Sequence, residues 1–198
     1  MAQSYLWLAA IAGLLFVSFL IALYIKRRPA VLGEAKTKGA WTPRPTPTIE
    51  MEHIHFMLGT WEVVENWEKG PWGDSSKGKS IFKTRLGPGG LSILTDVESA
   101  GPQGQSRTHI MSAWNPYLEA YQGCSVSNLD LGALIWTGKW EQGNLVFDGE
   151  IQVRGKKLAF RRVLSQITKT TYTSQEFISE GGGPMKLLVT GHARRKAA

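Results

Sequence analysis

The sequence predicts a mainly β protein, an antiparallel barrel of about ten strands with a short capping helix, preceded by one transmembrane helix. Two observations lead to this expectation. Beyond Gly59, short segments with period-two alternation are separated by Gly, Pro and Asn turn signals, with no helical pattern between them. Near the amino terminus lies a long run without charge. Of the 198 residues, 42% are hydrophobic and 20% charged, which excludes a disordered or collagen-like chain.

Three regions follow from these patterns: residues 1–28 as a membrane anchor with a basic flank, 29–48 as a Pro-rich linker, and 49–198 as the barrel domain. The anchor runs from Tyr5 to Ile25, which is 21 residues without a charged side chain. At about 1.5 Å per residue such a helix spans a hydrocarbon core of roughly 30 Å. Lys26, Arg27 and Arg28 follow it, and the positive-inside rule then predicts an outside amino terminus and a cytoplasmic barrel.

A cleaved signal peptide, which would leave a periplasmic or secreted barrel, is the alternative for the same run. It requires positive charge before the apolar segment and a small-residue cleavage site after it. This chain has no basic side chain before Tyr5, and the run ends in Lys26-Arg-Arg28. These features favour an uncleaved anchor.

The charge distribution indicates a membrane surface as a partner. The net charge is +7, of which residues 26–50 contribute +4 (six basic, two acidic) and residues 51–198 contribute +3 (17 basic, 14 acidic). A basic segment beside an apolar helix is typical of contact with anionic lipid. The clusters at Arg161-Arg162 and Arg194-Arg-Lys196 lack an aromatic-interleaved patch, so no nucleic-acid partner is expected.

The linker and anchor also carry candidates for protein contacts. Pro29, Pro43, Pro45 and Pro47 stiffen the linker toward polyproline geometry. Within the anchor, Ala9 and Gly13 form a small-xxx-small pair that would let a neighbouring membrane helix approach. Trp41, Trp72 and Tyr117 are large aromatics in linker or turn segments and are candidate partner contacts.

In the barrel domain, a helical pattern over Ile49–Leu58 precedes the strands. Its apolar residues recur at spacings of three and four, and two glutamates lie in its first turn. The expected strands cover residues 61–67, 80–86, 91–97, 108–114, 121–127, 134–140, 145–153, 157–164, 171–178 and 185–192. A meander of this many strands usually closes into a barrel because closure removes the unpaired edges.

Several segments together resemble a known family: His53-Ile-His-Phe-Met-Leu-Gly-Thr-Trp61, Leu86-Gly-Pro-Gly-Gly90, Ser112-Ala-Trp-Asn-Pro-Tyr117 with Tyr121, Trp136-Thr-Gly-Lys-Trp140 and Arg194-Arg-Lys196. The chain is similar, over about residues 50–196, to a bacterial family of domains of uncharacterised function with a lipocalin-like, calycin-type barrel. The resemblance implies that glycine in the Gly-x-Trp opening permits a tight approach and that the tryptophan plugs one barrel end. It implies no catalytic residues.

Alternation along the strands predicts which side chains line the barrel. The expected lining residues are Trp61, Trp67, Phe82, His109, Met111, Phe147, Phe160 and Arg162. Glu65 and Glu176 fall on the same rows. With eight tryptophans in the chain, bulky rings favour a filled interior, and a cavity for a hydrophobic ligand is the alternative.

Motifs that would indicate chemistry have simpler interpretations. Gly73–Ser80 matches the P-loop letters, but strand-like residues follow it where a P-loop needs a helix. His53 and His55 are two apart and make a poor chelate on a helix. Cys124 has no activating neighbour in the sequence. We therefore expect no catalytic, cofactor-binding or metal-binding residues.

These observations favour a non-catalytic accessory subunit of a larger membrane protein complex, such as a bioenergetic one. Its partners would be the lipid bilayer and other integral-membrane subunits. A membrane-tethered protein that binds a small hydrophobic ligand in the barrel is the alternative. An enzyme with an unrecognised site is a second alternative.

Overall fold

The computed structural model describes residues 45–71, 73–129, 132–153 and 155–197. The predicted anchor at residues 5–25, the pair Ala9 and Gly13, the basic cluster at residues 26–28, and Trp41 and Trp72 lie outside these ranges. None of the helices within the described ranges has the length and apolar character needed to cross a bilayer.

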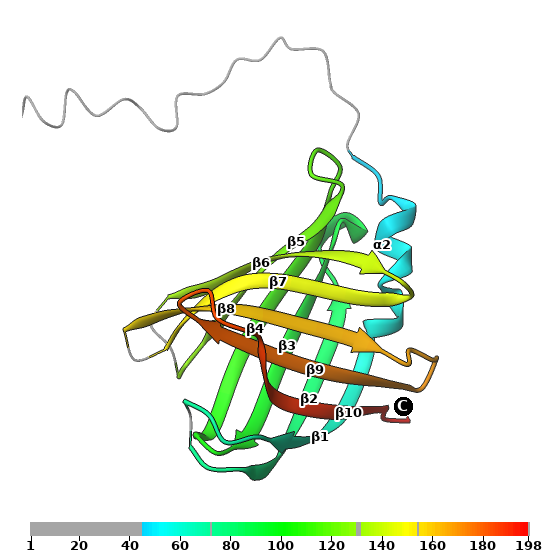
Figure 1. Ribbon diagram of the computed structural model, residues 1–198. Coiled ribbons are helices and arrows are strands. Elements are labelled where there is room, and N and C mark those ends of the chain that lie inside the picture. Colours follow the sequence, from blue (N-terminus) through cyan, green and yellow to red (C-terminus); the bar gives the residue numbers. More distant parts are fainter. Residues whose placement is uncertain (1–44, 72, 130–131, 154, 198) are drawn as a thin grey trace, which may run out of the picture. The chain divides into compact units, whose positions relative to one another are not determined.

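The described residues form ten strands that close into one antiparallel barrel (Figure 1). They are β1 (Gly59–Trp67), β2 (Ser76–Leu86), β3 (Ser92–Gly101), β4 (Gly104–Asn115), β5 (Ala120–Ser127), β6 (Ala133–Glu141), β7 (Asn144–Val153), β8 (Lys156–Ser165), β9 (Thr171–Glu180) and β10 (Lys186–Arg195). Each strand pairs with its neighbours in sequence, and β1 pairs with β10 to close the barrel. The prediction of about ten strands in a closed meander is confirmed.

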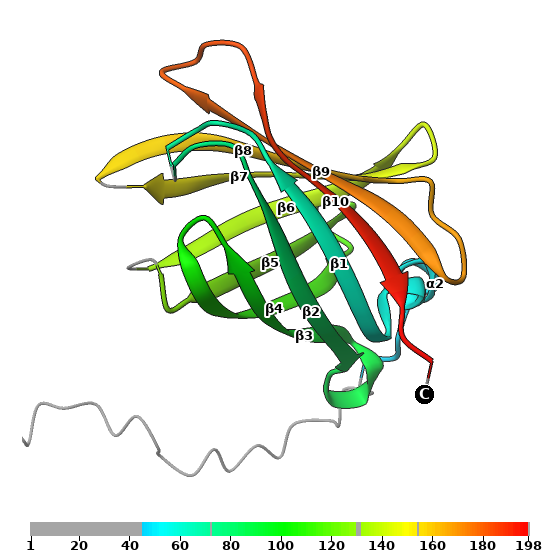
Figure 2. The ribbon, with the colours of Figure 1, turned by 90° about the horizontal axis from the view of Figure 1, so that it is seen from below.

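The capping helix is shorter than the predicted ten residues. It consists of α2 (Ile49–His53) and a 3₁₀ turn, η1 (His55–Met57), and a second 3₁₀ turn, η2 (Pro88–Gly90), joins β2 to β3. Figure 2 shows α2 beside the start of β1 and the end of β10, so it covers one end of the barrel. Met51 and Ile54 are 1% and 2% exposed, and they pack into the core at this end.

The Gly-Thr-Trp segment at the start of β1 closes the same end of the barrel. Trp61 is buried, and its indole Nε1 donates a hydrogen bond to the carbonyl of Met57 at 2.9 Å. Arg195 lies over the ring and donates through Nη2 to the carbonyl of Phe56 at 2.7 Å. Gly59 has φ +100, and a Cβ there would lie 2.8 Å from Nη1 of Arg195. The positive φ therefore favours glycine at this position, and a Cβ there would displace the Arg195 guanidinium.

Candidate ligand-binding cavity

The barrel encloses an open cavity of about 610 Å³, although the aromatic content predicted a filled interior. The cavity reaches the β3–β4 and β5–β6 turns, at the end opposite α2, through Gly101, Gly104 and Leu129. At the other end, Leu145, Leu164 and Tyr172 pack beneath the capping helix and are at most 4% exposed. The cavity is thus a cup with one closed and one open end.

Glycines on adjacent strands explain why the large rings leave this space. Trp136 on β6 is directly opposite Gly123 on β5 and Gly149 on β7, and Phe147 is opposite Gly138. A Cβ at position 123 would overlap the Trp136 ring, and one at 138 would overlap the Phe147 ring. Each ring therefore occupies the space above a glycine on a neighbouring strand, and the two rings meet edge to face with centroids 4.7 Å apart.

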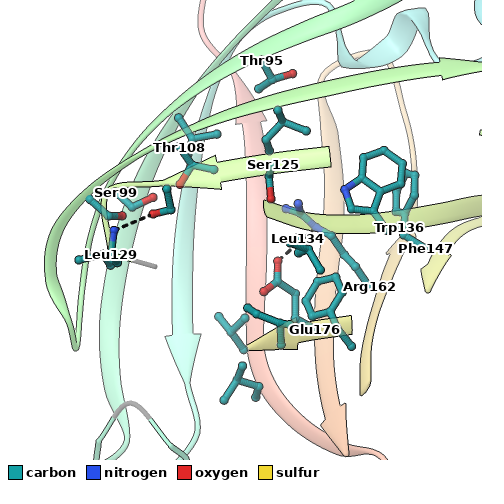
Figure 3. Close-up of a pocket in the computed structure, with 18 of the residues that line it drawn as sticks. Thr95, Ser99, Thr108, Ser125, Leu129, Leu134, Trp136, Phe147, Arg162 and Glu176 are labelled. Carbon is teal, nitrogen blue, oxygen red and sulfur yellow. Dashed lines mark hydrogen bonds and ion pairs between the residues drawn. The ribbon is translucent and has the colours of Figure 1, made fainter. Parts of the chain in front are cut away.

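One side of the cavity is rich in hydroxyl groups, and Figure 3 shows Thr95, Thr108 and Ser125 across from Trp136 and Phe147. The serine and threonine residues that line the cavity come from β2 to β5: Thr84, Thr95, Ser99, Ser106, Thr108, Ser112, Ser125 and Ser127. Thr84 and Thr95 bond to each other at 2.9 Å. Within the described part of the chain, the hydroxyls of Ser106, Thr108 and Ser125 have no hydrogen-bond partner. They are free to bond a ligand.

Five charged residues in the described ranges line the cavity, and three of them, from β1, β8 and β9, interact with one another: Glu65, Arg162 and Glu176. Arg162 Nε lies 3.3 Å from Glu176 Oε1 and donates a hydrogen bond to Ser174 Oγ at 3.0 Å (Figure 3 shows the ion pair). Its guanidinium carbon lies 5.7 Å from the centre of the Phe82 ring. The guanidinium is thus held between an acid and an aromatic face.

Glu65 is the centre of a hydrogen-bonded chain on the β1–β3 wall. Its Oε1 lies 2.5 Å from Ser80 Oγ, and its Oε2 accepts a bond from Trp67 Nε1 at 3.0 Å. Ser80 is 0% exposed and lies 2.8 Å from Ser99 Oγ. Burial raises the pKa of Glu65 above its usual range, and this exceeds the lowering by the Ser80 hydrogen bond.

Tyr172 lies near the closed end of the cavity. Burial raises its pKa to about 12, and the nearby charge of Arg162 opposes this in part. Its ring packs against that of Trp61, with centroids 4.9 Å apart. The hydroxyl therefore stays protonated at neutral pH and remains a hydrogen-bond donor.

Of the predicted lining residues, the structure places Trp67, Phe82, Phe147, Phe160 and Arg162 on the cavity wall, and Trp61 in the core at the closed end. The prediction is wrong for His109 and Met111, which lie on the outer face of β4. Met111 is 48% exposed, and His109 bonds to Asp96 at 2.6 Å outside the barrel.

Register is the physical reason for this correction. Ile93 on β3 faces the core and pairs with Ser112, so Met111, one residue earlier, must face outward. Sequence alternation could not settle the phase of β4, because Ile110 and Met111 are adjacent and both apolar. Tyr117 lies in the β4–β5 turn and is 94% exposed.

Sequence reasoning missed the glycine–aromatic pairs and the chain of Glu65, Ser80 and Ser99. Glycines inside predicted strands were an available signal, since a strand interior glycine often marks a close approach by another group. The structure also shows where the P-loop letters and the candidate metal ligands lie. Ser76–Leu86 is a strand, so no helix follows the P-loop letters. Within the described ranges, no three His, Cys, Asp or Glu side chains cluster as metal ligands.

Comparison with one solved structure, that of Rv2717c, supports the fold. No family model matches the chain, and no curated protein matches its sequence. The solved structure of Rv2717c from M. tuberculosis is similar at a TM-score of 0.57 and 9% identity, over 76% of this chain and 99% of that one. The S-type phycobiliprotein lyase CPES from Guillardia theta matches at a TM-score of 0.49 and 14% identity, over 78% of this chain and 96% of that one. The described chain is a lipocalin-like β-barrel with an accessible interior.

Proposed function

We propose that this protein binds a small, largely apolar molecule inside its barrel. The observation that carries the proposal is the open cavity of about 610 Å³. Ligand sites in proteins commonly measure roughly 300 to 1,000 Å³ and combine apolar walls with a few placed polar groups. An aromatic side, a hydroxyl side and a charged cluster meet this description, whereas a purely structural barrel of this size would gain stability from a filled core.

A matched pair of substitutions on β5 tests the proposal. Ser125 lines the cavity, and its neighbour Val126 faces outward and is 46% exposed. Full-length protein is titrated with the neutral apolar dye Nile red, and energy transfer from tryptophan to the dye reports binding. We expect Ser125→Phe to weaken binding at least about tenfold, because the new ring occupies ligand space. Val126→Phe serves as the control and keeps wild-type affinity. Equal affinities in all three proteins, or no transfer at all, contradict the proposal.

The predicted anchor gives this function a location. If residues 5–25 cross a membrane with Lys26, Arg27 and Arg28 inside, the cavity would open in the cytoplasm within a linker's length of the bilayer. Apolar ligands partition into lipid, so a tethered barrel would meet them there. Protease added to intact spheroplasts tests the orientation. We expect residues 50–196 to be protected, and their digestion would show the opposite orientation.

A second candidate function, the accessory subunit of a membrane complex, is favoured by an apolar row on the outer face. Leu94, Met111, Cys124 and Ile135 face one another across β3 to β6, and Ile135 is 68% exposed. Exposed apolar surface of this kind marks contacts with other proteins. Native sizing after mild detergent extraction tests it: a larger assembly that Ile135→Glu disrupts would support it. A monomer in several mild detergents would contradict it.

A further inference from the structure

The charges inside the barrel do not balance. Of the five charged residues that line the cavity in the described ranges, Glu150 and Lys157 pair with each other at 2.6 Å and have side chains 61% and 64% exposed. The interior then holds one cation, Arg162, and two acids, Glu65 and Glu176. With both acids ionised, the interior carries one excess negative charge.

Arg162 is already matched by Glu176. The two side chains lie 3.3 Å apart and are 21% and 22% exposed, so their attraction is screened less than that of a surface pair. The pair together is formally neutral. A ligand in the cavity therefore meets no net charge at the pair of Arg162 and Glu176.

Among the residues that the structure describes, the hydrogen-bond partners of Glu65 are the neutral groups of Ser80 and Trp67. The Ser80 hydroxyl has one proton and an ionised carboxylate has none, so Ser80 donates to Glu65, and Ser99 donates to Ser80. Both carboxylate oxygens thus accept a bond, which suits the ionised form. Burial, and after it the charge of Glu176, oppose ionisation and raise the pKa of Glu65, although the Ser80 and Trp67 hydrogen bonds and the charge of Arg162 lower it in part. A half-buried carboxylate of this kind is stabilised by a cation placed next to it.

We propose that the ligand is a cationic amphiphile, an apolar body with one protonated amine, which binds with its ammonium against Glu65. This inference rests on the proposed ligand-binding function. The ammonium neutralises the excess charge of the interior, and a charge-assisted hydrogen bond to a carboxylate is about twice as strong as a neutral one. The apolar body packs on the aromatic side formed by Phe82, Phe147 and Phe160.

An apolar carboxylate is the competing ligand, since the two Nη atoms of Arg162 make no hydrogen bond within the described residues. Such a ligand would bring a third negative charge into an interior with a single cation. The carboxylate of such a ligand would repel the carboxylates of Glu65 and Glu176, and this repulsion is stronger inside a protein than in water. The charge balance therefore favours the amine.

Three ligands with the same ten-carbon chain test the inference: decylamine, decanol and decanoate, each used to displace Nile red from the full-length protein. We expect the amine to displace the dye at roughly tenfold lower concentration than the alcohol, with the carboxylate weakest. Glu65→Gln should remove the advantage of the amine over the alcohol. Glu62→Gln is the matched control, because Glu62 lies on the same strand, pairs with Lys79 on the outer face, and should leave the advantage intact.

The wild-type protein offers a second measurement should Glu65→Gln fail to fold. Affinity for decylamine should fall as the pH is lowered through the raised pKa of Glu65, while affinity for decanol stays constant. Equal affinities for all three ligands would overturn the inference and leave the proposed function standing. Tightest binding of decanoate, lost in Arg162→Gln, would also overturn it. If Nile red and all three ligands fail to bind, the proposed function itself fails.

Discussion

The guanidinium carbon of Arg195 lies 4.4 Å from the centre of the Trp61 ring, which joins the last strand of the barrel to the first. The same guanidinium donates to the carbonyls of Leu58, Phe56 and Lys169, the last at 2.8 Å. One side chain therefore fastens the capping segment, the β8–β9 turn and the buried indole. The contact between Arg195 and Trp61 closes the barrel at the end covered by α2, which is the closed end of the cavity.

Removing that guanidinium should destabilise the fold. Arg195→Met removes the hydrogen bonds to the partly buried carbonyls of Leu58 and Phe56 and the cation from the indole face, so we expect a loss of roughly 2 to 4 kcal/mol in the free energy of unfolding. Urea denaturation followed by tryptophan fluorescence measures it. Arg194→Met is the control, since Arg194 is exposed on the outer face, and its effect should stay within about 0.5 kcal/mol. Equal effects of the two substitutions would contradict this role of Arg195.

The open cavity should depend on the glycine beneath Phe147. A Cβ in Gly138→Ala meets the Phe147 ring and forces it toward the cavity centre. Overpacking of this kind costs about 1 to 3 kcal/mol, and the displaced ring should also weaken Nile red binding. The double substitution Gly138→Ala with Phe147→Leu restores the space. Additive effects of the two substitutions in a double-mutant cycle would mean that the ring and the glycine do not interact.

The raised pKa of Glu65 sets the pH dependence of stability. The folded pKa lies above the unfolded value, so the folded state holds the proton more tightly, and this contribution is fully present below the unfolded pKa. It is lost as the pH rises through the folded pKa. Glu65→Gln removes this loss, so the stability of the variant relative to wild type should increase as the pH is raised. Urea denaturation at several values from about pH 4 to about pH 8 measures it, and a constant difference would contradict the assignment.

Tyr172 should titrate last among the tyrosines in the described ranges, with a pKa of about 12. The unfolded chain loses this proton near pH 10, so the stability contributed by the protonated hydroxyl falls as the pH rises between about 10 and about 12. Ultraviolet absorbance titration follows phenolate formation. The highest step should vanish in Tyr172→Phe, and its survival there would assign it to another tyrosine.

The sequence by itself determined the strand count and the antiparallel order. Turn residues and period-two segments are local signals, and the Gly-Thr-Trp segment at the start of β1 implied the plug through its resemblance to a known family. The ten expected segments all became strands. Most of them extend beyond the expected ends by one to four residues because pairing continues until a turn stops it, whereas β3 and β10 begin one residue later than expected. Closure of β1 on β10 followed from the need of a long meander to hide its edges.

Only the tertiary structure decided which face of each strand looks inward and whether the interior is open. The phase of β4 depends on its register with Ile93. On β10 the register shifts between Leu187 and Val189, and the adjacent residues Leu188 and Val189 both line the cavity. Ring volume alone predicted a filled barrel, but the space that the Trp136 side chain occupies depends on Gly123 and Gly149 across the strands. The cluster of Glu65, Arg162 and Glu176 likewise joins residues up to 111 positions apart in the chain (176 − 65). Such relations are long-range consequences of register, which no local pattern in the sequence contains.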